Sequence, residues 1–285
     1  MAGAAGVIGR LLVPMLLAAG HEVAGTTRSA AKCEQIAAAG ARPVVADALD
    51  RGAMFAAVRA ARPDAVIHQL TDLSGRDFAG NARLRIEGTR NLVDAALVVG
   101  VGRMIAQSIA WIYVPGRGPA SEDTPLDLDA HGSRGRLVAA VQALEHAVAE
   151  MPVGIILRYG VLYGPGTWYA RDGWITEQLR RGEFEANEGV TSFLHVADAA
   201  QAALQALGWP AGPLNVVDDE PAAGTDWLPL YASLVGAPLP PLRPGVEGWE
   251  RGASNARARH LGWRPQYPTW REGFKEVLSD TLLGW

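Results

Sequence analysis

The feature that most constrains the fold is a run of regularly spaced glycines at the start of the chain. Gly3, Gly6 and Gly9 stand at every third position, directly before an amphipathic stretch. Glycines at this spacing permit a tight turn, and the N–H groups and positive dipole of the following helix can then face an anion. The pattern predicts a phosphate-binding turn that includes Val7 and Ile8, although Gly/Ala-rich helix starts are common and the turn needs support from its context.

The β-strand that should precede such a turn is missing. Only Met1 and Ala2 come before Gly3, whereas this strand is normally central in the sheet. Without it, the sheet has an unfilled position with unpaired backbone groups. We therefore expect that a misplaced start codon or a trimmed sequence has removed residues from the N-terminus.

The chain up to about residue 110 alternates short β-branched runs with Ala/Leu-rich stretches, which is the pattern of βαβ units around a parallel sheet. Strands are predicted at residues 21–27, 42–45, 65–68, 103–107 and 154–158. Helices are predicted at residues 9–19, 30–39, 53–61, 84–99, 137–150, 174–181, 226–235 and 270–283. Residues 116–135 are rich in Gly, Pro, Asp and Ser and predict a long loop at the mouth of a site.

Composition excludes several classes of function. A net charge of −4 with scattered arginines argues against a nucleic-acid partner. A single cysteine, Cys33, excludes an internal disulfide, so a cytoplasmic location is expected. The apolar stretch 7–19 contains Arg10 and Pro14 and is too short to span a bilayer, so we expect no membrane role. We predict no metal site.

The end of the second predicted strand bears on the choice of dinucleotide. An NAD-selective site usually has an acid here for the ribose 2′-hydroxyl, but this chain has Arg28 after two threonines. An arginine suits a 2′-phosphate, which favours NADP over NAD. The alternative is that Arg28 is a solvated loop cation.

A series of segments, in the right order, resembles the extended short-chain dehydrogenase/reductase family, which includes NAD-dependent epimerases and dehydratases. The matching segments are residues 3–9, 45–48, 86–92, 157–166, 192–200, 214–218 and 255–265. The resemblance implies an α/β fold: a Rossmann domain with a doubly wound parallel sheet over residues 1–165, and a smaller C-terminal substrate lobe over 166–285. It also implies that residues near 190–217 return to the first domain.

The resemblance implies two groups of binding residues. Those of the cofactor site are Gly3, Gly6, Val7, Ile8, Gly9, Arg28, Asp47, Ala48, Gln69 and Leu70, with the Asp47 side chain reaching the adenine. Those of the substrate site are Trp111, Trp168, Tyr169 and Arg171, near the carboxyl ends of the strands, where ligands of open α/β sheets bind. An aromatic pair followed by Arg171 suits a partly apolar substrate with an acid or phosphate group. The alternative is that the rings pack between the lobes.

The family's usual proton relay cannot be found in this sequence. Family enzymes use a tyrosine whose pKa is lowered by a lysine four residues later. The chain has only Lys32 and Lys275, and arginines stand four positions before both. Aligning residues 143–145 with the family's A-x-E places Leu137 and Val141 at the Tyr and Lys positions.

Other side chains must then act if the protein moves a proton. Ser108, at the end of a strand, and Tyr163, in the best-matched segment, form the leading pair of candidates. His131 ranks behind them. A second alignment, set by the loop, places His131 at the position of the family's tyrosine, and an imidazole can act as an acid or base near neutral pH. The alternative is that His131 is a surface histidine of the loop. Arg85 replaces an asparagine that, in the family, helps to hold the catalytic helix or a water.

The sequence therefore favours an NAD(P)-dependent oxidoreductase or epimerase/dehydratase-like enzyme with a non-standard acid/base, acting on a small-molecule substrate. The main alternative is a non-catalytic NAD(P)-binding protein that senses redox state. A non-redox isomerase or lyase is the third hypothesis. The sequence leaves a homodimer open.

Overall fold

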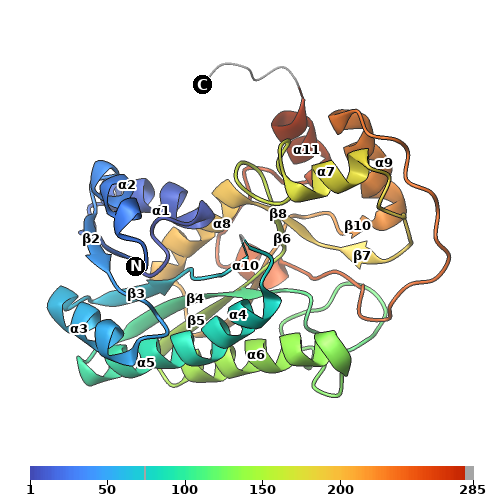
Figure 1. Cartoon of the computed structure of the whole chain (residues 1–285). Helices are drawn as coiled ribbons and strands as arrows, with labels where there is room; N and C mark the ends of the chain where they lie inside the picture. The colour runs from blue at the N-terminus through green and yellow to red at the C-terminus, as the bar shows by residue number, and fades with distance from the viewer. Residues whose placement is uncertain (74, 280–285) are drawn as a thin grey trace. The chain divides into compact units, whose positions relative to one another are not determined.

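A computed structural model describes residues 1–73 and 75–279, which form two compact units (Figure 1). The first unit comprises residues 1–108, 126–158 and 200–214. The second comprises residues 109–125, 159–199 and the described part of 215–285. Residues 109–125 and 159–165 thus belong to the second unit, although the sequence assigns them to the Rossmann domain.

The first unit is built on a parallel sheet. Its strands are β1 (Ala24–Thr27), β2 (Arg42–Val45), β3 (Ala65–His68), β4 (Arg103–Ile109), β5 (Val153–Tyr159) and β9 (Gly212–Val216). β1 pairs in parallel with β2, and β3 pairs in parallel with β4 in a group whose order is β3-β4-β5-β9. The β-branched runs of the sequence therefore form the strands predicted from them, and the predicted α/β fold class is confirmed.

Ala2 joins the two groups of strands. It forms parallel bridges to Thr26 of β1 and to His68 of β3. Its N–H donates to the carbonyl oxygen of Ile67 at 2.8 Å, and its own carbonyl accepts from the Gln69 N–H at 2.9 Å. Ala2 thus occupies the position where the sequence predicts an unfilled place in the sheet.

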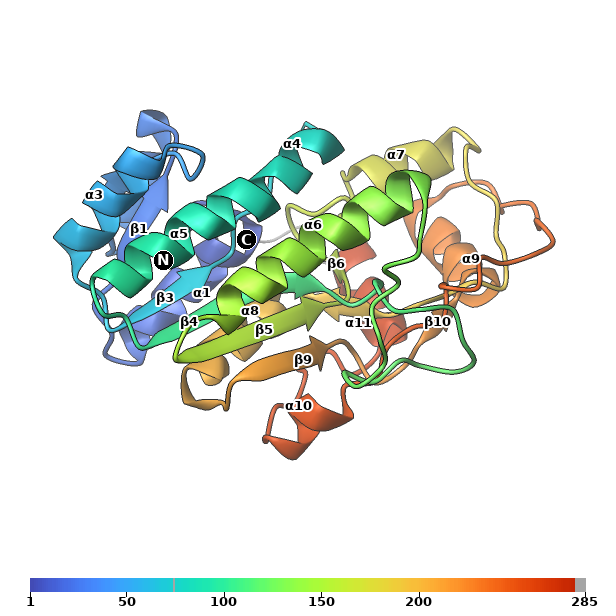
Figure 2. The ribbon, with the colours of Figure 1, turned by 90° about the horizontal axis from the view of Figure 1, so that it is seen from below.

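Helices cover both faces of this sheet. They are α1 (Val7–Ala18), α2 (Cys33–Ala38) after the short η1 (Ala30–Lys32), α3 (Arg51–Ala61), α4 (Phe78–Arg83), the π-helical turn η2 (Leu84–Gly88), α5 (Thr89–Val98), α6 (Gly132–Ala149), α8 (Val196–Gln205) and η3 (Ala206–Gly208). Helices α3, α5 and α6 lie side by side on one face, and α1 and α2 lie on the other (Figures 1 and 2). Buried Met54, Leu92, Val93, Met104 and Leu144 belong to the core beneath the first group.

The helix predicted at residues 84–99 begins earlier and contains a π-helical turn. Asp77 caps α4, because its carboxylate accepts from the Gly80 N–H at 2.8 Å. η2 and α5 then continue directly from α4. A single π-helical turn inside an α-helix is rare and is frequently found at functional sites.

The second unit combines short strands with an aromatic core. β6 (Val161–Tyr163) pairs in parallel with β8 (Phe193–His195), and β7 (Val190–Thr191) pairs antiparallel with β10 (Ala222–Ala223). Its helices are α7 (Trp174–Arg180), α9 (Gly224–Val235), α10 (Ala256–His260) and α11 (Trp270–Leu278). Helices were predicted at the positions of α7, α9 and α11, although residues 280–283 of the last prediction lie outside the described part of the chain. The core contains Tyr163, Phe193, Trp227, Tyr231, Trp270 and Phe274.

Candidate functional site

The glycine turn has the geometry of an anion-binding loop. Gly3 has a positive φ of 88°, and a Cβ there would lie 2.6 Å from the Gln69 carbonyl oxygen, so both conformation and space require glycine. A Cβ on Gly9 would collide with the Gly3 carbonyl oxygen, which keeps α1 close to the turn. Gly6 is different: it is exposed, and its Cβ would meet only the Gly3 oxygen, at 3.2 Å. Protein atoms therefore leave the space above Gly6 open to a ligand.

The N-terminus of α1 is suited to a phosphate. Gly6 is the N-cap residue, no side chain caps the helix, and its first turn contains no acid. Arg10 donates the first backbone hydrogen bond of the helix, to the Gly6 carbonyl oxygen at 3.0 Å. The N–H groups before Arg10, including those of Val7 and Ile8, precede the regular helical ladder and can bind an anion. The turn thus fits the pyrophosphate of a dinucleotide.

Arg28 lies directly after β1, where the sequence places the ribose of the cofactor. Its guanidinium forms a two-contact ion pair with Asp72, at 2.9 and 3.1 Å, and 62% of its side chain remains exposed. The hydrogen bond and charge of Asp72 raise the pKa of Arg28, and Asp47 adds a smaller contribution. Arg28 is therefore a partly paired cation that is accessible to solvent.

The other predicted cofactor residues lie at the ends of neighbouring strands. The Asp47 carboxylate, two residues after β2, accepts from the Leu49 N–H at 2.9 Å. Ala48 is buried, and Asn91 of α5 donates to its carbonyl oxygen at 2.9 Å. Gln69 is buried beside Gly3, and the Leu70 N–H donates to His68 Nδ1 at 3.2 Å. The structure therefore brings the Gln69 backbone next to the glycine turn.

Ser108 belongs to a buried polar network. Its hydroxyl donates to Glu145 Oε1 at 2.7 Å, and Arg158 contacts both oxygens of the same carboxylate, at 2.9 and 2.6 Å. All three residues are buried, and they link β4, α6 and β5. The Ser108 proton is thus engaged by Glu145, which favours a structural role for Ser108 over the predicted catalytic one. Sequence reasoning used Glu145 only to set a register and did not identify this network.

The face of α6 that carries Glu145 has no proton-transfer group one or two turns before it. Val141 and Leu137 stand four and eight residues earlier, which is close to two turns of one helix face. Val141 is fully buried and Leu137 is half-buried. His131 is the exposed N-cap residue of α6, and its side chain makes no capping hydrogen bond. This position supports the interpretation of His131 as a surface histidine.

Tyr163 is surrounded by the core of the second unit. Its ring packs edge-on against Phe193, His195 and Phe274, at centroid distances of 6.2, 5.1 and 5.0 Å. Its hydroxyl is buried and has no hydrogen-bond partner among the described residues. Burial, followed by the charges of nearby acids, raises the pKa of Tyr163 well above its usual value. These surroundings favour a packing role over the predicted role of acid/base.

The predicted substrate residues also pack inside the second unit. Tyr169 packs against Phe193 and Trp227, at centroid distances of 5.5 and 5.9 Å, and burial raises its pKa. Trp168 packs against Trp174 at 5.6 Å. Arg171 donates to the carbonyl oxygen of Leu278, near the end of α11. Trp111 is half-buried after β4. Trp168 and Tyr169 therefore contribute to packing within the second unit. The sequence left packing between the lobes as the alternative to substrate binding.

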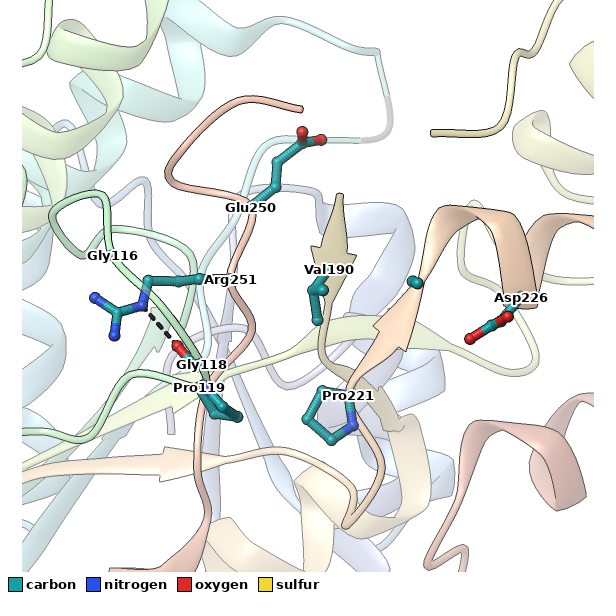
Figure 3. A pocket seen from close by; sticks show the side chains of 9 residues that line it. Gly116, Gly118, Pro119, Val190, Pro221, Asp226, Glu250 and Arg251 are labelled. Carbon is teal, nitrogen blue, oxygen red and sulfur yellow. Dashed lines mark hydrogen bonds between the residues drawn. The ribbon is translucent and has the colours of Figure 1, made fainter. Parts of the chain in front are cut away.

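A cavity of about 400 Å³ lies in the second unit but contains none of the predicted site residues (Figure 3). Its lining residues are Gly116, Gly118, Pro119, Val190, Pro221, Ala223, Asp226, Glu250 and Arg251. The Arg251 guanidinium donates to the backbone carbonyls of Gly118, Arg117 and Val114, at 2.8, 3.0 and 3.2 Å. Arg251 thus holds the loop that follows β4.

Residues 1–73 and 75–279 contain neither a metal cluster nor a membrane-spanning helix. No group of three or more His, Cys, Asp or Glu side chains in this part of the chain is placed to hold a metal ion. Within the same residues, every helix is too short or too polar to cross a membrane.

Comparisons with known proteins agree with this geometry. The model of the NAD-dependent epimerase/dehydratase family matches residues 1–216. A 3-diazoavenalumate denitrifying reductase of Streptomyces sp is 48% identical over 300 aligned residues, which cover 96% of this chain and 97% of that protein. A UDP-glucose 4-epimerase of Mycolicibacterium smegmatis is 28% identical over 291 residues, covering 93% and 92%.

A solved structure shows the same fold. The UDP-glucose 4-epimerase of Thermus thermophilus, in complex with NAD, superimposes with a TM-score of 0.77 and 26% sequence identity, covering 97% of this chain and 96% of that one. This match confirms the Rossmann fold class, and the family match confirms the resemblance seen in the sequence.

Proposed function

Because this chain belongs to the NAD-dependent epimerase/dehydratase family, we propose that it is a nicotinamide-dependent reductase that removes nitrogen from a diazo compound carrying a carboxylate. The observation that carries the proposal is the 48% identity, over 96% of the chain, to a reductase whose name specifies a diazo acid and denitrification. The family and its relatives support an enzyme, so the redox-sensor hypothesis is set aside.

The side chains of α6 suit this reaction better than a sugar epimerisation. Oxidation or reduction at an alcohol or ketone carbon requires a proton to leave or reach the oxygen, which is the task of a general acid/base. The form of the diazo compound that would react is the aryl diazonium cation, in which hydride addition forms a carbon–hydrogen bond while the carbon–nitrogen bond breaks, and dinitrogen leaves with that bond's electrons. No proton is gained or lost, so Leu137 and Val141 can replace a Tyr-Lys pair without loss of function.

Apolar side chains also protect a reactive substrate. A diazonium group is attacked by water and by other nucleophiles, and a dry, apolar wall limits such side reactions. Leu137 and Val141 offer neither a proton nor a nucleophile. Apolar side chains at these two positions, where the family pattern has polar ones, therefore support the proposed substrate class.

The cofactor residues follow from the geometry of the first unit. The turn of Gly3, Gly6 and Gly9 would hold the pyrophosphate, Asp47 would reach the adenine, and Arg28 would contact a 2′-phosphate. When bound, the reduced nicotinamide supplies the hydride. The family match supports NAD dependence, and the exposed guanidinium of Arg28 supports a preference for NADP.

The proposed reaction is tested by offering the enzyme two substrate classes. With reduced cofactor and an aryl diazonium carboxylate, we expect cofactor oxidation and release of dinitrogen in equal amounts. With UDP-glucose and oxidised cofactor, we expect no UDP-galactose. Epimerisation without dinitrogen release would contradict the proposal and favour the activity named for the 28% identical relative.

Removing the Arg28 side chain should erase the preference for NADPH. A charge-assisted contact with the 2′-phosphate, screened by solvent at this exposed position, should give NADPH about tenfold higher affinity than NADH. Calorimetric titration of Arg28→Ala should show equal affinities for the two. Arg51→Ala is the control, because Arg51 is a similarly exposed arginine paired with Asp94. Equal affinities in the unchanged protein would contradict the assignment.

Replacing Tyr163 with phenylalanine should change turnover less than tenfold. The Tyr163 hydroxyl is buried without a partner among the described residues, so its removal should leave the melting temperature unchanged or raise it. A general acid typically contributes 10²–10⁴-fold. A loss of about 100-fold or more in Tyr163→Phe, with the fold intact, would restore Tyr163 as the proton donor.

A further inference from the structure

Arg85 is a buried cation without a matching anion. Only 7% of the residue is exposed, and it lies in the π-helical turn η2. Among residues 1–73 and 75–279, none forms a hydrogen bond or an ion pair with its side chain. Arginine is rarely buried unless it is paired, because an unpaired charge loses its hydration without compensation. The structure therefore leaves a positive charge that a bound anion would neutralise.

The acids on the elements that pack against η2 already have partners. Within this run of helix, Glu87 pairs with Arg83 at 3.0 Å. On α5, Asp94 pairs with Arg90 at 2.6 Å and also contacts Arg51. On α6, Glu145 is held by Arg158 and Ser108. No described acid on these elements is left over for Arg85.

The polar neighbour of Arg85 cannot supply a negative charge. His68 is buried at the end of β3, and its Nδ1 accepts from the Leu70 N–H. Its Nε2 must then carry the proton and donate to Thr89 Oγ1, at 2.9 Å. Burial, followed by the charge of Arg85, lowers the pKa of His68 to about 4. His68 is therefore neutral at pH 7. Burial also lowers the pKa of Arg85, to about 10, which leaves the guanidinium charged.

The positive charge of Arg85 stands at a different position of the chain from the lysine that the family resemblance implies. The resemblance places a lysine at position 141 of α6 and an asparagine at position 85. This chain differs at both positions, with apolar Val141 on α6 and a cation on η2, and these two elements pack against each other. The cation on η2 is a guanidinium, which can bind a carboxylate through two parallel hydrogen bonds.

We propose that Arg85 binds the carboxylate of the substrate and thereby positions it for reduction. This inference rests on the proposed function, because that function supplies a substrate with a carboxylate. A guanidinium with little access to water discriminates strongly between a carboxylate and a neutral amide. Arg85 is therefore assigned as the residue that selects substrates with a carboxylate over analogues in which a neutral amide replaces it.

The test is a binding measurement with an unreactive carboxylate, so that it does not depend on turnover. Cinnamate and its neutral analogue cinnamamide are titrated calorimetrically against the protein saturated with oxidised cofactor. We expect cinnamate to bind more tightly than cinnamamide, and Arg85→Gln to weaken cinnamate about tenfold or more while leaving cinnamamide unchanged. Arg83→Gln is the matched control, because Arg83 is two residues away but exposed and paired with Glu87.

A second measurement separates binding from a structural role. Removing an unpaired buried charge should keep or raise the melting temperature of the ligand-free protein, so Arg85→Gln should melt no lower than the unchanged protein. The pKa of His68, followed by NMR, should rise in this variant. A lower melting temperature would assign Arg85 to structure and overturn the proposal.

The remaining outcomes distinguish this proposal from the proposed reaction. Equal binding of cinnamate to Arg85→Gln and to the unchanged protein would overturn the carboxylate site, as would an equal affinity of the unchanged protein for cinnamate and cinnamamide. If Arg85→Gln weakened the binding of cofactor but not of cinnamate, Arg85 would be assigned to the dinucleotide site, and the carboxylate site would be overturned. Cinnamate binding through Arg85 without dinitrogen release from a diazonium substrate would refute the reaction and leave the carboxylate site standing.

Discussion

Replacing Gly6 with valine should abolish dinucleotide binding and leave the fold intact. Gly6 has a φ of −79°, which valine adopts without strain, and its Cβ would meet only the Gly3 carbonyl oxygen, at 3.2 Å, a close contact that a small shift of the turn relieves. The isopropyl group would then fill the space that the pyrophosphate requires at the N-terminus of α1. We expect the affinity for reduced cofactor to fall by more than about 100-fold, equivalent to about 2.7 kcal/mol, in a calorimetric titration.

Two control variants sharpen this experiment. Gly102→Ala should bind cofactor normally, because a Cβ at Gly102 has no neighbour within 4 Å. Gly9→Ala should lose stability as well as binding, since its Cβ would collide with the turn itself. Undiminished cofactor binding by folded Gly6→Val would show that the dinucleotide binds elsewhere.

Replacing Arg158 with methionine should destabilise the first unit by about 3–5 kcal/mol, because it leaves the buried Glu145 carboxylate without its cation. Ser108 alone cannot compensate that charge, because it contributes a single hydrogen bond to Glu145. Urea unfolding followed by circular dichroism measures the loss.

The double variant Glu145→Leu with Arg158→Met is the matched control. Replacing both charges with apolar groups removes the uncompensated charge, so we expect it to recover most of the lost stability. The exposed pair of Arg83 and Glu87 should matter little, with a cost below about 1 kcal/mol for Arg83→Ala. A similarly small cost for Arg158→Met would contradict the structural role of this network.

The sheet and its phosphate-binding turn could be predicted because their causes are local. β2 and β3 have the predicted bounds, since short β-branched runs between helical stretches specify the strands of a parallel sheet. Gly3 and Gly9 are required by the backbone conformation and close packing that their spacing predicts. The early start of the helix before η2 was missed because its signal, the cap formed by Asp77, lies in a segment without clear apolar periodicity.

The roles of individual polar side chains could not be predicted in the same way. Ser108 donates to Glu145, 37 positions later in the chain, and Glu145 is held by Arg158, 50 positions after Ser108; only the folded sheet brings them together. Tyr163 lies in a well-matched segment, but the match does not reveal whether its ring faces a ligand or a core. The sequence shows that Arg85 departs from the family pattern, but only the structure shows that its side chain is buried.

The origin of the new carbon–hydrogen bond tests the central claim most directly. The enzyme is given an aryl diazonium carboxylate and cofactor carrying deuterium at nicotinamide C4, on the transferred face, in ordinary water. Mass spectrometry and NMR of the product should show one deuterium at the carbon that lost nitrogen, and the same reaction with unlabelled cofactor in heavy water should place none there. Hydrogen from the solvent at that carbon, or no nitrogen-free product at all, would contradict a reductase that works by hydride delivery without a proton donor.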